Sequence, residues 1–362
     1  MWTRRSLLLN LSLAALLSAS GSRLAPAAID ESKASLGGGS KRVRIPRTDL
    51  TVSRLGYGAG SLIGWDTKPI GKEDIDKAAR LIHTACDQGI NLFDHADIYA
   101  YGKAEAVFGE VLRRSPALRE KIVIQSKCGE RLGEGPQNAS TRVDLSHEYI
   151  IGAVERSLKR LGTDRLDILL LHEVDALAEP DEVSQALEKL YRSGKVRHFG
   201  VSNHSASQIE LLRKSVTRPL VINQIQISLA KPEPIADGLS VTLQTISKVP
   251  REELPYGRDA GLLDYCRLND IQVQAWWPLR TLLNLPSDPS PKLKAITRLL
   301  AEISQKRDTT PAVIALAWLL RHPAGIVPIV GTSNPKNLIE DCGSMGFEIT
   351  REEWYDLLLA AA

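Results

Sequence analysis

Cysteine is scarce in this sequence, which has only four in 362 residues: Cys86, Cys128, Cys266 and Cys342. They form no Cys-x-x-Cys pair, and no histidine stands at zinc-ligand spacing from them, so we predict no metal site. Cys86 and Cys342 fall on the first and last of the barrel helices predicted below, which would be neighbours. A disulfide between them stays open at this point, beside the alternative that both are free thiols of the core.

Clusters of basic residues are also missing. No run of lysine and arginine alternates with aromatic residues, which excludes nucleic acid as a partner. The formal charge is +3, and Arg4, Arg5 and Arg23 supply all of this excess, because residues 1–27 contain no acidic residue. With 43% hydrophobic and 25% charged residues, the composition is typical of a soluble globular protein.

Residues 1–27 have the features of a targeting segment, or signal peptide. A basic start is followed by the apolar stretch Ser6 to Ala19 and by Ala25-Pro26-Ala27, a small-x-small cleavage site. The apolar stretch is too short to span a bilayer, so we expect no stable membrane span once the segment is removed. Residues 28–42, which include Gly37-Gly38-Gly39, are predicted to be a flexible linker to a single folded domain at residues 43–362.

The first residues resemble a twin-arginine signal. Thr3-Arg4-Arg5-Ser6-Leu7-Leu8 carries the paired arginines, and Arg23 near the cleavage site suits this route better than the general secretory one. The resemblance implies export to the periplasm. The alternatives are a single-pass anchor and a mispredicted start codon, which would make the protein membrane-anchored or cytoplasmic.

From Val43 onward, apolar β-rich runs alternate with helical patterns, and the alternation repeats eight times. Most runs are continuous apolar segments of about five to eight residues, as parallel strands covered on both faces require. Eight strand–helix units without a break predict an α/β fold, the closed (β/α)8 TIM barrel. Val43 to Val52 is predicted to form a hairpin that closes the bottom of the barrel. The predicted strands are Leu55 to Gly60, Ile90 to Asp94, Ile122 to Lys127, Leu166 to His172, His198 to Asn203, Leu220 to Ile227, Ile271 to Pro278 and Ile326 to Gly331.

Several helix starts can be read between these strands. Ser205 followed by Gln208 forms a capping box. The spacing of apolar residues predicts a further helix within Leu145 to Gly162. Three other starts place a capping side chain before a proline at the first helical position, namely Ser290-Pro291, Thr310-Pro311 and Asn334-Pro335.

Polar residues close several of the apolar runs. In an α/β barrel the active site lies where the strands end, and Asp94, Tyr99, Lys127 and His172 all lie at or just after such ends. The pKa of tyrosine is near 10, so a nearby cation is needed to lower it, and Lys127 can do so. Asp94 can pair with Lys127, while His172 can hydrogen-bond a substrate carbonyl and the tyrosine hydroxyl.

Each of these residues also has an ordinary structural alternative. A lysine or aspartate that closes a strand is usually a cap or a surface charge, and a single histidine after an apolar run is more often a core residue. Four such residues at the correct strand ends favour a proton-donor site. The sequence offers no acyl-transfer nucleophile with an adjacent base, and no glycine loop that would cradle a phosphate before a helix.

With these residues, the chain resembles the aldo/keto reductase family over nearly all of residues 43–358. The family signature has an aspartate, an alanine two residues on and a tyrosine five residues on. The resemblance implies carbonyl reduction with NAD(P)H, with Tyr99 as general acid, Lys127 and Asp94 as its tuning pair, and His172 orienting the carbonyl. The signature residues here are Asp94, Ala96, Tyr99, Glu105 and Gly109.

The same resemblance implies contacts to the nicotinamide. Ser202 and Asn203 match a fifth-strand motif whose side chains bind the carboxamide, and Gln224 matches a sixth-strand glutamine that does the same. Trp276 stands where an aromatic ring stacks on the nicotinamide, although the family more often has tyrosine there and ordinary barrel packing is the alternative. Ala230 to Asp259 is far longer than a usual strand–helix loop, and we expect it to lie over the cofactor.

Val327 to Asn334 resembles the eighth-strand segment that binds the adenosine phosphate, followed by a helix N-terminus suited to anions. Gly331 and Thr332 are its expected contacts. Gly331 replaces the lysine usual in NADPH-binding members, and Asn337 replaces the arginine expected six residues later. Lys336 lies adjacent and could partly substitute. NADPH is the expected cofactor, with NADH as the alternative.

These features predict an enzyme that reduces small aldehydes or ketones. The alternative is a cofactor-sensing or regulatory barrel with little turnover, as some members of the family are. The tail after Met345 is short, which predicts an open substrate pocket with loose selectivity. The commonest form of the family implies a monomer.

Overall fold

The structure is a computed structural model that describes residues 41–131, 142–236 and 261–361. All of them belong to one compact unit, Leu36–Ala362. The predicted targeting segment and almost all of the predicted linker lie outside the described residues. The same is true of most of the long connection Ala230 to Asp259, so its predicted position over the cofactor stays a prediction.

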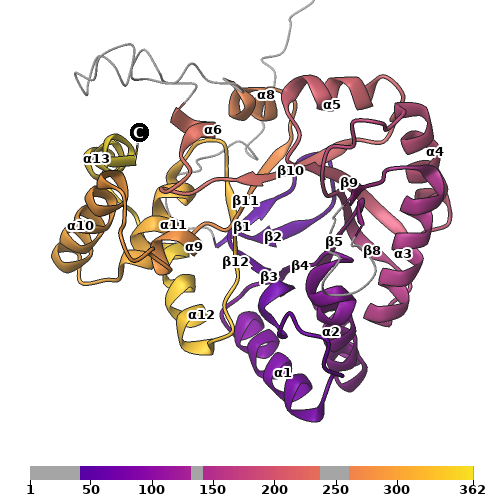
Figure 1. Cartoon of the computed structure of the whole chain (residues 1–362), viewed down its shortest axis with the longest axis horizontal. Coiled ribbons are helices and arrows are strands. Elements are labelled where there is room, and N and C mark those ends of the chain that lie inside the picture. Colours follow the sequence, from indigo (N-terminus) through magenta and orange to yellow (C-terminus); the bar gives the residue numbers. More distant parts are fainter. Residues whose placement is uncertain (1–40, 132–141, 237–260, 362) are drawn as a thin grey trace, which may run out of the picture. The chain divides into compact units, whose positions relative to one another are not determined.

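Eight parallel strands form a closed barrel, in which the last strand pairs with the first. Each strand lies within or overlaps one of the eight apolar runs, so the predicted (β/α)8 fold is confirmed. Figure 1 shows these strands in the centre with helices around them. In barrel order the strands are β3 (Gly56–Gly58), β4 (Leu92–Asp94), β5 (Val123–Cys128), β8 (Leu166–Leu171), β9 (Val196–Ser202), β10 (Leu220–Gln226), β11 (Gln272–Trp276) and β12 (Val327–Val330).

The four helices whose starts the sequence predicts begin at those positions. Ser205 forms the expected capping box with Gln208, and the side chains of Ser290, Thr310 and Asn334 each accept a backbone N–H of the helix that follows. The described helices are α1 (Lys72–Asp87), α2 (Lys103–Arg114), α3 (His147–Leu161), α4 (Pro180–Arg192), α5 (Ala206–Arg213), α6 (Glu233–Ala236), α8 (Leu262–Leu268), α9 (Arg280–Leu283), α10 (Pro291–Lys306), α11 (Pro311–Arg321), α12 (Pro335–Cys342) and α13 (Arg351–Ala361).

The predicted hairpin is present below the barrel. Strands β1 (Arg42–Arg44) and β2 (Thr51–Ser53) pair in antiparallel fashion. Their hairpin contributes Ile45, Leu50 and Val52 to an apolar cluster with inward-facing strand residues such as Leu92 and Ile168. The lower half of the barrel interior is therefore filled by side chains, and polar groups are left for its other end.

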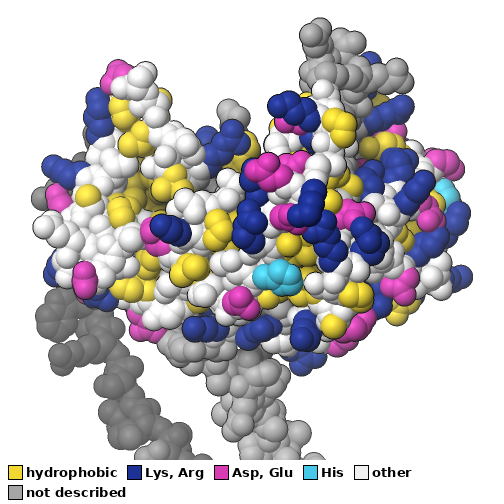
Figure 2. Space-filling model, turned by 90° about the horizontal axis from the view of Figure 1, so that it is seen from below, with side chains coloured by type: hydrophobic (Ala, Val, Ile, Leu, Met, Phe, Trp, Pro, Cys, Tyr) yellow, Lys and Arg dark blue, Asp and Glu magenta, His cyan; other side chains and the backbone are white. Residues whose placement is uncertain are grey.

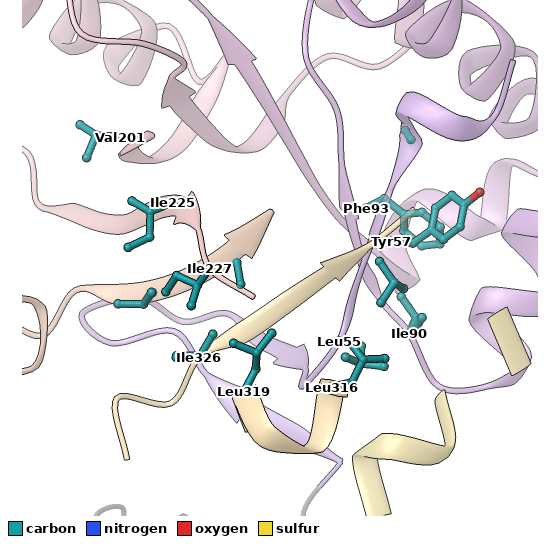
Figure 3. Close-up of a cluster of buried hydrophobic side chains, with 14 of the residues drawn as sticks. Leu55, Tyr57, Ile90, Phe93, Val201, Ile225, Ile227, Leu316, Leu319 and Ile326 are labelled. Atoms are coloured by element: carbon teal, nitrogen blue, oxygen red, sulfur yellow. The ribbon is translucent and has the colours of Figure 1, made fainter. Parts of the chain in front are cut away.

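A second, larger core lies between the strands and the helices. Leu55 and Ile326 belong to it together with Leu316 and Leu319 of α11, and Figure 3 shows these side chains close together. Outward-facing residues of the strands pack against the helices, whereas alternate residues face the interior, because side chains of a strand alternate between its two faces. This alternation decides which strand residues can take part in a site inside the barrel.

The tail after Met345 ends in helix α13, which packs against α10. The rings of Trp354 in this helix and Trp318 in α11 stack at 5.6 Å. Each indole N–H donates to the backbone carbonyl oxygen of the other tryptophan, at distances of 3.0 and 3.1 Å. These contacts tie the tail to the helix layer. Within the described parts of the chain, no helix is long and apolar enough to cross a membrane.

All four cysteines are free thiols. Helices α1 and α12, which carry Cys86 and Cys342, are in contact as predicted, but no disulfide joins them. Burial raises the pKa of Cys86 to about 11 and that of Cys342 to about 12, so both stay protonated at neutral pH. On the face shown in Figure 2, basic and acidic side chains are interspersed.

Candidate active site

The four predicted site residues, Asp94, Tyr99, Lys127 and His172, form a tetrad at the carboxyl end of the barrel strands. Asp94 ends β4, Lys127 is the penultimate residue of β5, and His172 follows β8. Tyr99 begins the 3-10 helix η3 (Tyr99–Gly102), one short loop after β4. Two backbone hydrogen bonds fasten this loop to β5, from the N–H of His95 at 2.8 Å and from the N–H of Asp97 at 3.0 Å. The loop that carries Tyr99 is thereby held beside Lys127.

Lys127 is the centre of this group. Its ammonium nitrogen Nζ donates to Oδ2 of Asp94 at 2.7 Å, to the carbonyl oxygen of His95 at 3.0 Å and to the hydroxyl of Tyr99 at 2.9 Å. The side chains of Lys127 and Asp94 are 0% and 2% exposed. An ammonium group has three N–H donors, and here each has a partner. The site therefore holds a buried cation directly against the phenolic oxygen.

The pKa values set the protonation state of this pair. Burial lowers the pKa of Lys127, but the charge of Asp94 and the contact with Tyr99 outweigh it and raise the value overall. Burial raises the pKa of Tyr99, and the lowering by Lys127 does not offset this. The expectation that Lys127 brings the pKa of Tyr99 below its ordinary value is therefore wrong for this structure. The cause is desolvation of the phenol, which sequence alone does not reveal. Tyr99 keeps its proton and can act as a donor.

His172 lies beside Tyr99, with ring centroids 6.1 Å apart. In the described part of the chain, the hydroxyl of Tyr99 is bonded to Lys127 and not to His172, contrary to the expected contact. Nδ1 of His172 is 3.5 Å from Oε2 of Glu130, without hydrogen-bond geometry. Burial and the nearby Lys127 lower the pKa of His172 to about 3, so the imidazole is neutral at physiological pH. A neutral ring can orient a carbonyl oxygen without competing as an acid.

The signature residues Glu105 and Gly109 lie on α2 and allow this helix to pack against β5 and α3. The buried carboxylate of Glu105 on α2 accepts from Ser126 Oγ at 2.7 Å and from Arg160 Nε at 2.8 Å. Ser126 is the neighbour of Lys127 in β5, so this contact holds α2 against the strand. A Cβ on Gly109 would collide with the backbone carbonyl of Arg160 on α3, and only glycine permits this approach of the two helices.

The residues expected to bind nicotinamide form a chain of contacts along neighbouring strands. The indole of Trp276 donates to Oδ1 of Asn203 at 2.9 Å, and Nδ2 of Asn203 donates to Glu173 at 2.8 Å. Asn203 has a φ of 59°, in the left-handed region that asparagine tolerates. The hydroxyl of Ser202 donates to the backbone oxygen of Gln224 at 2.9 Å. The structure thus brings all four residues to one rim of the barrel.

The expected phosphate contacts lie on the adjacent strand. Gly331 and Thr332 follow β12, which pairs with β11 and with β3. The backbone oxygen of Thr332 accepts from the hydroxyl of Tyr57 at 2.8 Å, which fixes the loop. Asn334 caps α12, and Asn337 and Lys336 are exposed on its first turn. This surface is open to a ligand, and it has no arginine at position 337.

Several residues near the site were not predicted. Gln125 and Gln274 are buried inside the barrel and hydrogen-bond one another at 2.8 and 3.0 Å. Burial and the charge of Glu173 raise the pKa of Glu130, which lies beside His172. Trp65 lies 6.2 Å from Tyr99, ring to ring, with about half of its surface exposed. The amides could have been recognised as polar residues inside apolar runs, but Trp65 and Glu130 follow no pattern that sequence alone displays.

This arrangement has a protonated phenol, a buried ammonium group beside it and a neutral imidazole at the mouth of a parallel barrel. It can deliver a proton to an oxygen atom and stabilise the phenolate that remains. Together with a rim of amide, hydroxyl and indole groups, these features define a barrel oxidoreductase that acts on carbonyl groups.

Comparisons with known proteins agree with this class. The model of the aldo/keto reductase family matches residues 54–358. The 6-dehydroglucose reductase of Novosphingobium aromaticivorans is 32% identical over 324 residues, covering 88% of this chain and 94% of that protein. Oxidoreductase YdhF of Escherichia coli is 32% identical over 321 residues, covering 89% and 97%. The structure of the glycerol dehydrogenase AKR11B4 from Gluconobacter oxydans matches with a TM-score of 0.70 at 26% identity, covering 88% and 95%. The chain belongs to the aldo/keto reductase family and is an NAD(P)H-dependent oxidoreductase.

The buried ring of His95 should make the protein sensitive to acid. Both ring nitrogens lack a partner among the described residues, and burial with the charge of Lys127 lowers the pKa of His95 to about 3. The unfolded chain therefore binds a proton between about pH 6.5 and pH 3 that the folded protein does not. The free energy of unfolding must then fall as the pH falls through this window. From pH 7 to pH 4.5, His95 alone should contribute a loss of roughly 2 to 3 kcal/mol.

We expect His95→Leu to remove this part of the pH dependence. Urea unfolding of wild type and variant at both pH values measures it, since the fall in free energy should be smaller in the variant. His83→Leu is the matched control, because His83 is exposed on α1 and its replacement should leave the pH dependence unchanged. Equal falls in wild type and His95→Leu would contradict the assignment.

Proposed function

We propose that the protein reduces small aldehydes or ketones, with Tyr99 donating the proton to the carbonyl oxygen as the alkoxide develops. The observation that carries this proposal is the 2.9 Å contact between the Tyr99 hydroxyl and the buried Nζ of Lys127. Tyr99 holds its proton in the resting site, and Lys127 stabilises the phenolate once the proton has left. His172, neutral and adjacent, orients the carbonyl. Bound NAD(P)H supplies the hydride.

The residues at the rim fit a nicotinamide. Ser202 and Asn203 offer a hydroxyl and an amide, and Gln224 offers its amide oxygen, because its Nε2 is bonded to Asp94 and Gln274. Such groups hold a neutral carboxamide in one orientation. Trp276 is fixed by its 2.9 Å bond to Asn203, so its indole ring is held at the edge of the site as a stacking surface. In this proposal Ser202, Asn203, Gln224 and Trp276 would hold the nicotinamide, which would supply the hydride.

Tyr99→Phe tests the assignment of the proton donor. The variant should bind NADPH normally but lose carbonyl reduction by about 100-fold or more, as is typical of removing a general acid. The assay follows nicotinamide absorbance with a panel of simple aldehydes, and cofactor binding is measured by fluorescence quenching.

Tyr101→Phe is the control, because Tyr101 lies in the same short helix but is 44% exposed and should tolerate the change. Near-normal turnover by Tyr99→Phe would contradict the mechanism. A wild-type protein that binds NADPH but turns over no member of the panel would favour the cofactor-sensing or regulatory alternative.

For the cofactor, we propose NADPH with weak discrimination against NADH. A 2′-phosphate is best held by a guanidinium group, and the exposed Asn337 cannot provide one. Gly331, Thr332 and the N-terminus of α12 are the proposed phosphate contacts, with Lys336 as the nearby cation.

Asn337→Arg should raise the preference for NADPH over NADH by roughly tenfold, the effect of one charge-assisted contact of about 1.4 kcal/mol. Titration of both cofactors by fluorescence quenching gives the ratio of dissociation constants. Ile339→Arg adds the same charge at another exposed position of α12 and should leave the ratio nearly unchanged. An unchanged ratio in Asn337→Arg would rule out this position as a phosphate contact.

We further propose that the protein is exported by the twin-arginine route and acts in the periplasm as a monomer. A barrel that binds its cofactor in the cytoplasm would have to cross the membrane folded, which this route permits. Sedimentation of the purified protein tests the monomer.

Replacing Arg4 and Arg5 by lysine should leave the uncleaved precursor in the cytoplasm, as fractionation would show. Arg23→Lys, outside the twin-arginine pair, should still be exported and cleaved. Export of the double variant at the normal level would exclude the twin-arginine route.

A further inference from the structure

Besides Lys127, the carboxylate of Asp94 has two further hydrogen-bond partners. It is almost completely buried, and its second oxygen, Oδ1, accepts from Nε2 of Gln125 at 2.6 Å and from Nε2 of Gln224 at 3.1 Å. A buried carboxylate is costly unless its oxygens are hydrogen-bonded. These two amides therefore stabilise the charge that fixes Lys127.

A third amide, that of Gln274, joins the other two. Its Oε1 accepts from Nε2 of Gln125 at 2.8 Å and from Nε2 of Gln224 at 2.9 Å, and its own Nε2 donates to Oε1 of Gln125 at 3.0 Å. All three glutamines are at most 1% exposed. Among the described residues, Gln274 hydrogen-bonds Gln125 and Gln224 but neither Asp94 nor another tetrad residue, so any influence on the reaction passes through these two neighbours.

The three glutamines form a layer between the apolar interior and the tetrad. Along β5, Val123, Gln125 and Lys127 are two residues apart and so share the inward face. Val123 belongs to the apolar cluster that the hairpin closes, and Lys127 belongs to the site. In the same way Ile222 of that cluster precedes Gln224 on β10. The three glutamines thus lie between the apolar side chains of the lower barrel and the charged side chains of the site.

We propose that Gln274 is a positioning residue for the reaction, which orients the amides of Gln125 and Gln224 so that both present N–H groups to Asp94. This inference rests on the proposed function. An amide side chain has two ends of similar shape, one a donor and one an acceptor only. The acceptor Oε1 of Gln274 lies within hydrogen-bond distance of both nitrogens, so it holds the donor ends in place. Without it, either amide can turn and place an oxygen against the carboxylate.

A series of contacts connects the three glutamines to Tyr99. Asp94 fixes Lys127, and Lys127 holds the hydroxyl of Tyr99. The negative charge of Asp94 also raises the pKa of Tyr99 and so opposes proton release. Donors that face Asp94 disperse this charge, whereas oxygens turned toward it would not. Loss of Gln274 should therefore slow proton transfer from Tyr99 more than it weakens substrate binding.

The experiment compares two substitutions on one strand. Gln274→Met keeps the length of the side chain but removes both hydrogen-bonding ends. Gln272→Met is the matched control, since Gln272 is also buried on the same face of β11, two residues earlier, and its Oε1 has no partner among the described residues. The concentration of folded enzyme is measured by titration with NADPH. The kcat value is calculated from this concentration, so a loss of folded protein does not lower it.

In Gln274→Met we expect kcat to fall about tenfold, the effect of losing one hydrogen bond of about 1.4 kcal/mol in the transition state. KM for the aldehyde should stay within about twofold, and the solvent deuterium isotope effect on kcat should rise because proton transfer becomes more rate-limiting. Gln272→Met should match wild type in all three. Gln125→Met, which removes the 2.6 Å donor directly, should change the same quantities in the same direction and serves if Gln274→Met does not fold.

Two results would overturn the inference while leaving the proposed function intact. One is an active wild type with unchanged kcat and isotope effect in a folded Gln274→Met, or in Gln125→Met where Gln274→Met does not fold, which contradicts the positioning role alone. The other is an equal loss in Gln274→Met and Gln272→Met, which assigns the effect to packing of β11. A wild type with no activity toward any carbonyl compound contradicts the proposed function and this inference together, so the failures can be told apart.

Discussion

The buried ion pair between Lys127 and Asp94 is the interaction on which the candidate site depends. Two opposite charges 2.7 Å apart with almost no exposure lose most of their hydration, and their attraction alone need not repay that cost. Here the remaining hydrogen-bonding capacity is also used. The ammonium group reaches a backbone carbonyl and a phenol, and the carboxylate reaches two amides. The barrel makes this arrangement possible, because neighbouring parallel strands end at one rim and alternate residues of each strand point inward.

Much of the fold could be predicted because its determinants are local. Strands covered on both faces require continuous apolar runs, and helix starts require capping side chains, so both leave legible patterns such as Ser205 with Gln208. The convergence of Asp94, Tyr99, Lys127 and His172 could be predicted for a related reason. Once a closed parallel barrel is established, residues at the ends of its strands must share one rim. The predicted lowering of the Tyr99 pKa was wrong, because its direction depends on how deeply the phenol is buried, which is a property of the packed structure.

The layer formed by Gln125, Gln224 and Gln274 shows a different limit of prediction from sequence. Gln125 and Gln274 are about 150 positions apart in the chain, and their contact depends on the relative height of β5 and β11 in the closed barrel. No spacing rule connects them. The signal that was available is weaker: a glutamine on the inward face of an otherwise apolar strand needs a partner, because a buried amide without one is costly. Such residues can be marked as unexplained from sequence, but their partners can be named only from the structure: Asp94 for Gln125, and the amides of Gln125 and Gln224 for Gln274.

The protonation states of the site explain why burial favours the proposed chemistry. A tyrosine whose pKa lay below the surrounding pH would be ionised before a substrate arrived. Burial instead raises the pKa of Tyr99 and keeps the proton on it, while Lys127 stays charged because Asp94 and the phenol outweigh its desolvation. When negative charge develops on a carbonyl oxygen, the proton can move to that oxygen, and the phenolate is left 2.9 Å from a cation that was already in place. His172 stays neutral over the same pH range, so Tyr99 is the tetrad residue placed to donate a proton, and the charge of Lys127 lowers the cost of forming its phenolate.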